Sequence, residues 1–348
     1  MYYIPIIKLK KREINKAKYL QSYLSHPNIV PFLELRYSLE STDKNTRVDD
    51  FVDSACIKTF FLGIPHKASV ISYGTGGNIK EDYLFIANSS ASKYLEESKQ
   101  LFLVDNCIPI YYIYSEEDLN FYKQFVELGH QQGRPVGLLA RPNLALRLDN
   151  NAIQKNDFLF IDLEGDEILS QKPNLERITF LFSSKIILIR ENRNLKTMNT
   201  HISLDGEAPL VNDLSTEFDN VLKSKIKLRL FGFADYCGFK NDVSIGSKPI
   251  DSSNFYPAIA LYQKQKTPPI FLGIRSSTIK QYGGFLGLAT LVKDRFDVLD
   301  PKNLTPLNAF INCEKTGDYT AWNVITQWFY IAQMSIFDDW KNFNISNY

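Results

Sequence analysis

The chain has 348 residues, 44% of them hydrophobic and 23% charged, which is typical of a globular protein with one large or two ordinary domains. Its 40 Lys and Arg residues against 39 Asp and Glu give a formal net charge of +1. That balance creates no long-range field for nucleic acid or an acidic membrane, so a nucleic acid or other anionic ligand would need a local basic patch. No run approaches the ~20 apolar residues of a membrane span. We expect a soluble, cytoplasmic protein without a membrane partner.

Cysteine and histidine residues form no recognisable metal or redox motif. The four cysteines lie far apart and make no CxxC pair, which favours reduced, buried thiols. The histidines show neither HxH nor HExxH spacing, so a zinc site of the usual kind is not expected. No GxSxG sequence is present, which disfavours nucleophilic hydrolysis. No cofactor is evident from these residues.

Short apolar runs alternate with stretches of helical periodicity along the first 240 residues. Eight runs are predicted as strands, at 2–8, 29–36, 57–64, 108–114, 134–140, 158–163, 185–190 and 227–234. Helices are predicted between most of them, at 12–24, 48–55, 92–103, 116–130, 174–182 and 214–223. The stretch between the third and fourth runs is less regular, with small strands at 69–73 and 83–87 around a glycine-rich loop.

Eight buried strands joined by helices within about 235 residues are typical of a TIM-like (β/α)8 barrel, either regular or distorted. An open, doubly wound sheet is the alternative. We assign 1–240 to the barrel and 241–348 to a C-terminal extension packed on it, because no linker rich in Pro, Gly or Ser separates them. The extension is predicted to hold short strands and a long helix, 320–340, with an aromatic stripe. The stripe favours packing against the barrel, and binding of a partner protein is the alternative.

Polar residues follow the predicted strands, at the edge of a barrel where βα loops form functional sites. The sixth strand, in FLFIDLEGDE, ends in Asp162 and Glu164, which point to the same side of an extended chain. The catalytic candidates are the acids Glu34, Asp162, Glu164 and Asp235. The ligand-binding candidates are Lys8, Arg36, Arg141, Arg190, Tyr236 and, in the extension, Arg275.

These charged groups support two interpretations. Carboxylates ringed by Lys and Arg bind Mg²⁺, position a phosphate or perform acid–base chemistry, so Mg²⁺ is a candidate cofactor although no metal ligand is assigned. The alternative is a structural network of ion pairs. Two other features, YGTGGN at 73–78 and KLKKR at 8–12, are interpreted as a hairpin turn and a solvated loop rather than as anion-binding sites.

Several of these stretches together resemble the phage and bacterial "beta protein" family. The likeness covers most of the chain, through YYIPIIKLKKREINKAKYL, IVPFLELR, FADYCGF, IRSS and GDYTAWNVI. Shared features are Lys8 after the first strand, Glu34 at the end of a Pro-containing strand, and the pair Asp235 and Tyr236 after the last barrel strand. The resemblance implies a role in phage–host conflict. Relatives often carry paired histidines where this chain has Gln-Trp-Phe at 327–329, which puts a histidine-based role of that helix in doubt.

Two functional classes follow from these observations. The first is a binding or regulatory component of anti-phage defence, as the resemblance implies, whose barrel face engages a ligand or partner. The second is a metal-assisted hydrolase or phosphodiesterase that uses the acids, with Lys8, Arg141 and Arg190 steadying an anionic substrate. A glycoside hydrolase is a weaker variant of the second class. The first is preferred because no recognised catalytic motif is present, but whether the protein is an enzyme stays open.

Overall fold

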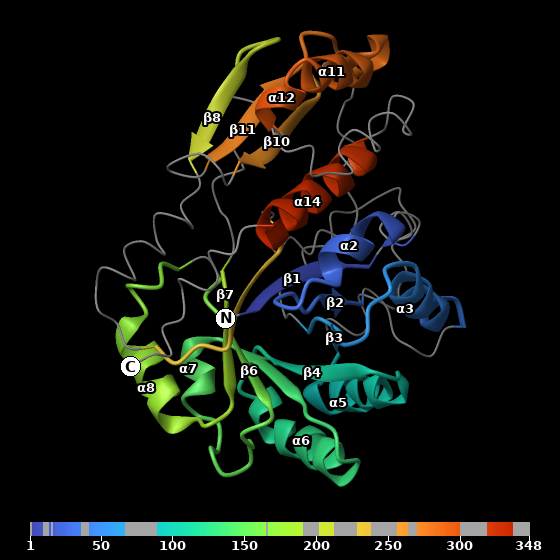
Figure 1. The fold of residues 1–348 in the computed structure, drawn as a ribbon. Coiled ribbons are helices and arrows are strands. Elements are labelled where there is room, and N and C mark those ends of the chain that lie inside the picture. The colour runs from blue at the N-terminus through green and yellow to red at the C-terminus, as the bar shows by residue number, and fades with distance from the viewer. Residues whose placement is uncertain are drawn as a thin grey trace.

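Eight parallel strands of the computed structural model close into a ring, with helices packed around it (Figure 1). The structure describes residues 2–9, 14, 17–35, 42–66, 89–164, 166–190, 202–211, 228–237, 256–263, 270–299 and 319–336. The ring closes because the strand at 232–235 is hydrogen-bonded both to the first strand and to the strand at 185–189. The predicted (β/α)8 barrel is therefore confirmed, and the alternative of an open sheet is wrong.

The barrel strands follow the predicted order. They are β1 (Tyr2–Lys8), β2 (Phe32–Glu34), β3 (Phe60–Gly63), β4 (Cys107–Ile113), β5 (Gly137–Ala140), β6 (Phe158–Asp162), β7 (Lys185–Ile189) and β9 (Gly232–Asp235). Several are shorter than predicted. β2 begins directly after Pro31, which has no N–H to donate to a neighbouring strand. β5 begins at Gly137, and the N–H of the preceding Val136 donates to Asp157 Oδ1 at 3.1 Å.

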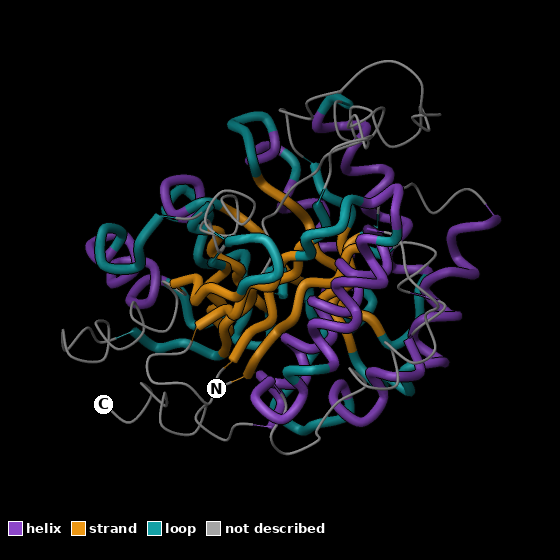
Figure 2. Tube along the Cα trace, turned by 90° about the horizontal axis from the view of Figure 1, so that it is seen from above, coloured by secondary structure: helices purple, strands orange, loops and turns teal. Residues whose placement is uncertain are grey.

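Short helices surround the strands, which occupy the centre of the view from above (Figure 2). They are η1 (Ala17–Leu20), α2 (Gln21–Leu24), α3 (Thr42–Ser54), α5 (Ala91–Lys99), η2 (Gln100–Leu103), η3 (Asp118–Asn120), α6 (Tyr122–Gln131), α7 (Pro142–Ala145) and α8 (Lys172–Leu181). In α6, Tyr122, Phe125, Val126 and Gly129 are buried, and their spacing forms one apolar stripe. The predicted elements at 69–73, 83–87 and 214–223, and the loop at 73–78, lie outside the described residues.

A second, three-stranded sheet lies beyond the barrel in Figure 1. Its order is β10 (Ala258–Gln263), β11 (Ile270–Arg275) and β8 (Glu207–Val211), and both pairings are antiparallel. Its helices are η6 (Lys280–Tyr282), α11 (Gly284–Lys293), α12 (Phe296–Leu299) and α14 (Tyr319–Ile336). β8 precedes the last barrel strand in sequence but belongs to this sheet, so a domain boundary at 240 cuts across the outer sheet.

α14 joins the outer sheet to the barrel. It packs on β10 and also contacts β1 and α2. Its aromatic side chains Trp322, Trp328, Phe329 and Tyr330 are all buried within the chain. The described part of the stripe predicted at 320–340 therefore packs in the core, and binding of a partner protein through this helix stays a prediction. None of the helices in the described ranges has the length and apolar character needed to cross a membrane.

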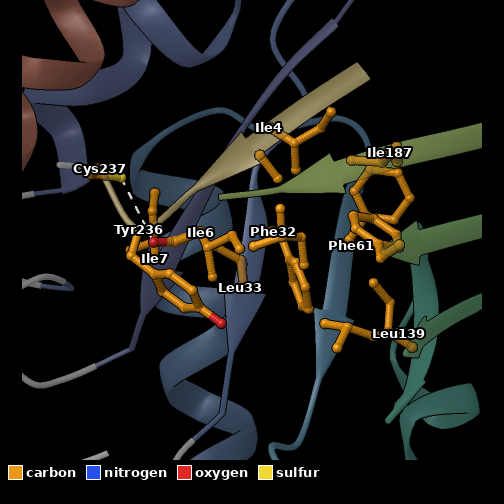
Figure 3. Close-up of a cluster of buried hydrophobic side chains, with 14 of the residues drawn as sticks. Ile4, Ile6, Ile7, Phe32, Leu33, Phe61, Leu139, Ile187, Tyr236 and Cys237 are labelled. Carbon is orange, nitrogen blue, oxygen red and sulfur yellow. Dashed lines mark hydrogen bonds between the residues drawn. The ribbon is translucent and has the colours of Figure 1, made fainter. Parts of the chain in front are cut away.

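The interior of the barrel is filled by side chains that alternate with outward-facing ones along each strand. Aromatic rings meet there from several strands: Phe32 lies 5.4 Å from Phe160 and 6.4 Å from Phe61, measured between ring centroids. Figure 3 shows part of this core, in which Phe32, Phe61 and Leu139 point toward one another. These inward positions define which residues of each strand reach the mouth of the barrel.

Candidate ligand-binding site at the carboxyl ends of the barrel strands

Glu34 and Asp162 face the interior of the barrel at its carboxyl end. Glu34 lies two residues after the inward-facing Phe32, and Asp162 lies two residues after the inward-facing Phe160. Because side chains two apart share a face of a strand, both carboxyl groups continue the interior columns of the barrel. Glu34 is only 1% exposed and Asp162 is 0% exposed. The sequence-based expectation that these acids lie at strand ends on one face is met.

Among the described residues, the Glu34 carboxylate is hydrogen-bonded by tyrosine hydroxyls and not by a Lys or Arg side chain. The hydroxyl of Tyr112 donates to Glu34 Oε1 at 2.7 Å, and that of Tyr236 lies 3.4 Å from the same oxygen. The second oxygen, Oε2, is buried and has no hydrogen-bond partner in the described part of the chain. A buried carboxyl oxygen without a donor is uncommon in folded proteins and costs free energy.

Asp162 is also held by tyrosine. The hydroxyl of Tyr114 donates to Oδ2 at 3.1 Å, and the backbone N–H of Glu164 donates to Oδ1 at 2.9 Å. Glu164 has a φ of 47°, and its carboxylate accepts a hydrogen bond of 2.7 Å from Arg141. The Arg141 guanidinium in turn lies 5.9 Å from the centre of the Tyr114 ring. Burial thus increases from the exposed Arg141, through Tyr114, to the fully buried Asp162.

The three tyrosines of the cluster stay protonated and act as donors. Burial, and after it the nearby carboxylates, raise the pKa of Tyr112, Tyr114 and Tyr236 well above the usual value of 10.0. Tyr236 was predicted as a ligand-binding residue, but Tyr112 and Tyr114 were not. The signal was present in IPIYYIY, because the two tyrosines are two positions apart on the strand and therefore share a face.

Gly63 makes room for Tyr112. A Cβ at this position would lie 2.7 Å from Tyr112 Cε2 and 3.1 Å from Phe32 Cε2. We expect Gly63→Ala to lower the free energy of unfolding by about 1–3 kcal/mol through overpacking, and to move the Tyr112 hydroxyl away from Glu34. Urea denaturation measures the loss. The same change made together with Tyr112→Leu should cost much less, and an equal cost in both backgrounds would contradict this assignment of the contact.

Asp235 does not join this cluster. It alternates with the inward-facing Ala234, so it points out of the barrel, where the hydroxyls of Tyr3 and Tyr330 donate to its two oxygens at 2.9 and 2.5 Å. The backbone N–H of Cys237 donates to Oδ1 at 2.9 Å. Tyr330 belongs to α14, so Asp235 links the barrel wall to the C-terminal helix. The structure therefore does not bring this catalytic candidate to the same site as Glu34 and Asp162.

Burial of Asp235 gives a testable pH dependence. Burial raises its pKa from 3.8 to about 6, while the hydrogen bonds from Tyr330, Tyr3 and Cys237 oppose the rise. Since the folded state holds the proton more tightly, this group's stabilising contribution is full below about pH 4 and is lost as the pH rises through about 6. The expected loss is about 3 kcal/mol. Between pH 4 and pH 7 the free energy of unfolding of the parent protein should therefore fall by about 3 kcal/mol relative to that of Asp235→Asn. Identical pH profiles for the two proteins would contradict this assignment to Asp235.

The remaining predicted binding residues are dispersed. Lys8 is the register neighbour of Glu34, and its ammonium lies 5.0 Å from the centre of the Tyr236 ring. Arg190 is buried, and its backbone N–H donates to Ala234 at 3.1 Å. Arg275 lies at the end of β11, where it donates to the Ile202 carbonyl at 3.2 Å. It is thus part of the outer sheet and not of the barrel mouth. Arg36 and the stretch 10–12 lie outside the described residues.

The described part of the chain holds buried free thiols and no cluster of metal-ligating side chains. No group of three or more His, Cys, Asp or Glu side chains is arranged there to hold a metal ion, and the Mg²⁺ expectation stays a prediction. Cys107 and Cys237 are buried free thiols, as predicted, whereas Cys56 is exposed. Burial raises the pKa of the Cys107 thiol to about 11, which disfavours a reactive thiolate.

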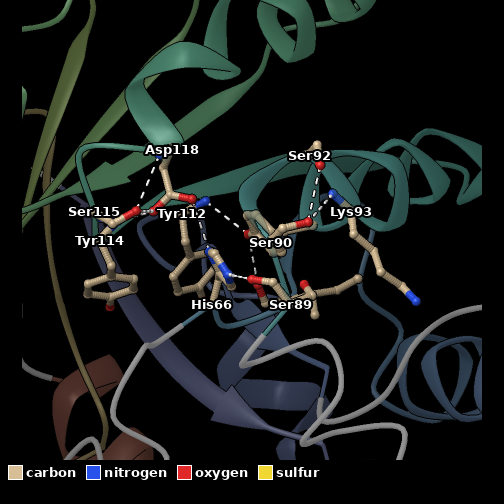
Figure 4. Close-up of polar contacts among 11 residues, drawn as sticks. His66, Ser89, Ser90, Ser92, Lys93, Tyr112, Tyr114, Ser115 and Asp118 are labelled. Atoms are coloured by element: carbon tan, nitrogen blue, oxygen red, sulfur yellow. Dashed lines mark hydrogen bonds and ion pairs between the residues drawn. The ribbon is translucent and has the colours of Figure 1, made fainter.

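A buried histidine next to the site was not predicted. His66, after β3, lies between two oxygens: its Nε2 is 3.1 Å from the Ser89 carbonyl, and its Nδ1 is 3.1 Å from Asp118 Oδ1 (Figure 4). Asp118 Oδ2 accepts the backbone N–H groups of Tyr114 at 3.0 Å and Ser115 at 2.8 Å. These contacts fix the backbone that carries the Tyr114 hydroxyl. A sequence signal was lacking, because His66 and Asp118 are far apart in the chain.

Comparisons with known proteins bear on the fold. No protein-family model and no curated protein matches the sequence. Among solved structures, the YdjI aldolase from Escherichia coli K12 shares 11% identity and a TM-score of 0.34, with 67% of this chain and 73% of that one covered. A tryptophan synthase complex from Pyrococcus furiosus shares 11% identity, a TM-score of 0.36, and 68% and 87% coverage. A GH113 β-1,4-mannanase shares 9% identity, a TM-score of 0.38, and 67% and 86% coverage. These similarities are low, so the barrel assignment rests on the chain's own strand pairing.

Proposed function

We propose that the mouth of the barrel binds a small molecule, and that the protein is a binding or regulatory component in phage–host conflict. The observation that carries the first part is Glu34 Oε2, a buried carboxyl oxygen at the carboxyl end of the barrel to which none of the described residues donates. An orphaned buried acceptor costs about 1–3 kcal/mol. Local violations of this kind concentrate at functional sites, where a ligand supplies the missing partner.

The surrounding groups support a preformed site. Tyr112 fixes one oxygen of Glu34 and leaves the other for a ligand, while Tyr114 fixes Asp162. Two buried phenols, the partly buried Tyr114 and two buried carboxyls leave few rotamer-rich side chains to order, which reduces the free-energy cost of binding. The more exposed Arg141–Glu164 pair forms the outer rim.

A thermal-shift screen with primary amines, alcohols, polyols and phosphates tests this proposal. We expect at least one compound to raise the Tm of the parent protein and not that of Glu34→Gln, since a ligand at about 100 times its Kd stabilises by about 3 kcal/mol. Glu207→Gln is the matched control, because Glu207 is an exposed acid of the outer sheet paired with Arg295. Equal shifts in the parent and Glu34→Gln for every active compound would place the binding elsewhere and refute the proposal.

A hydrolase is the second candidate, because Glu34 and Asp162 both lie close enough to Tyr114 to raise its pKa. Two carboxyls beside one phenol are suited to general acid–base catalysis, and a phosphodiesterase of the metal-assisted kind would require added Mg²⁺ or Mn²⁺. The test is p-nitrophenol release from bis-p-nitrophenyl phosphate and from p-nitrophenyl glycosides, with and without each metal. Activity lost in Asp162→Asn and kept in Glu207→Gln would favour this candidate over binding alone.

The phage–host role rests on the resemblance to phage and bacterial beta proteins. Cells that express the protein are expected to change the efficiency of plating of at least one phage from a diverse panel. The change should disappear in Glu34→Gln if the barrel mouth serves that role. Equal plating on cells with and without the protein across the panel would remove this part of the proposal.

A further inference from the structure

We propose that the ligand of the barrel mouth is a small organic cation, whose ammonium group binds Glu34 Oε2 against the rings of Tyr112 and Tyr114. This inference rests on the proposed function and names the chemical class of its ligand. It follows from three properties of the cluster: the kind of hydrogen-bonding group that is missing, the charge around it, and the aromatic faces beside it.

The missing group is a donor. Glu34 Oε1 already accepts from Tyr112, and Oε2 accepts from none of the described residues, so a ligand O–H or N–H would satisfy it. An anion such as phosphate brings acceptors to this oxygen and would leave it unpaired. Phosphate would also face the Asp162 carboxyl, which lies near the same Tyr114 ring. The inner end of the site thus disfavours anions, whatever the outer rim binds.

The charge around Glu34 favours a ligand ammonium group over a ligand hydroxyl group. The Glu34 carboxylate contacts the phenols of Tyr112 and Tyr236, and no Lys or Arg of the described residues pairs with it. Its register neighbour Lys8 places its ammonium over the Tyr236 ring. A buried carboxyl without a cationic partner gains most from a ligand that carries positive charge, because the low local dielectric strengthens a charge-assisted hydrogen bond.

The aromatic rings of Tyr112 and Tyr114 also favour an organic cation as the ligand. The Tyr112 and Tyr114 rings lie 5.8 Å apart and are tilted by 32°, and both phenols bond a carboxyl of the cluster. Ammonium groups bind aromatic faces within about 6 Å of the ring centre. Lys8 already makes such a contact with Tyr236 from within the chain. Carboxyl oxygens backed by electron-rich rings are the usual elements of an organic-cation site.

The test uses three probes with one carbon skeleton: n-butylammonium chloride, 1-butanol and sodium butyrate. Isothermal titration of the full chain should give binding for n-butylammonium, at least tenfold weaker binding for 1-butanol, and none for butyrate. Glu34→Gln keeps the oxygen that Tyr112 bonds and is expected to weaken n-butylammonium binding at least tenfold. Glu207→Gln, at an exposed acid of the outer sheet, should match the parent protein.

The outcomes separate this inference from the proposed function. Binding of 1-butanol or butyrate that equals or exceeds that of n-butylammonium, and that is lost in Glu34→Gln, would overturn the ligand class and leave the binding site standing. Unchanged n-butylammonium binding in a folded Glu34→Gln protein would overturn the inference as well. If no compound of the wider screen depends on Glu34, the proposed function itself fails.

Discussion

An Asp235→Ala variant is expected to unfold with a free energy roughly 3–5 kcal/mol lower than that of the parent protein. Three groups donate to Asp235: the hydroxyls of Tyr3 and Tyr330 and the backbone N–H of Cys237. All three residues are buried, so alanine leaves three donors without an acceptor, and each orphaned donor costs about 1–3 kcal/mol. Urea denaturation at pH 7 measures the difference.

Tyr330→Phe is the matched control variant, in which Asp235 loses only part of its hydrogen bonding. It removes one of the three donors and leaves Asp235 with the other two, so the expected loss is about 1 kcal/mol. Because Tyr330 is on α14, hydrogen exchange of the α14 amides should accelerate in both variants, and more in Asp235→Ala. A loss below about 1 kcal/mol in Asp235→Ala would show that the site relaxes around the cavity and that Asp235 does not hold α14 to the barrel.

Replacement of Arg134 is expected to have the second large effect. Its guanidinium donates to the carbonyls of Phe102 at 2.6 Å, Val104 at 3.0 Å and Cys107 at 2.7 Å. It also lies 5.6 Å from the centre of the Phe102 ring. One side chain thus satisfies three carbonyls of the turn between η2 and β4. Arg134→Ala should lower the free energy of unfolding by roughly 3–5 kcal/mol, because hydrogen bonds from a charged donor contribute about 1.5–3 kcal/mol each.

Arg134→Lys tests geometry separately from charge. The single ammonium of lysine cannot span three carbonyls as the planar guanidinium does, so about 2 kcal/mol should still be lost. Arg147→Lys is the control, because Arg147 pairs with Glu116 on the exposed surface and its replacement should change stability by less than about 0.5 kcal/mol. Equal stability of Arg134→Lys and the parent protein would contradict a geometric role.

The barrel could be predicted from the sequence because its strands are buried on both faces. That burial produces continuous apolar runs such as KIILI at β7, and the runs recur at the spacing of βα units. The predicted bounds of the strands were less accurate, because apolar residues continue past the paired segments: β2 begins only after Pro31, and the N–H of Val136 before β5 donates to the Asp157 side chain. β8 was missed because EAPLV pairs with a strand far along the chain, and nothing local marks that partner.

The site could be predicted only in part. Glu34 and Asp162 were found because strand ends in a barrel share one face, whereas Asp235 shares the end of the barrel but not the interior. A one-residue difference in alternation sends it toward α14. The roles of Tyr112 and Tyr114 depend on contacts with residues far away in the sequence: Glu34 is 78 positions from Tyr112, and Asp162 is 48 positions from Tyr114. Such contacts follow from ring closure and register, which no single segment of the chain encodes.

The path of the chain through the outer sheet constrains its synthesis. β8 leaves the ribosome before β9 closes the barrel, yet its partner among the described strands, β11, begins at Ile270, about 60 residues after β8 ends. At 5–20 residues per second, the nascent chain carries β8 as an unpaired edge for roughly 3 to 12 s. An exposed edge strand is a template for pairing with other chains. Pro209, which interrupts the donor row of β8, limits such association during that interval.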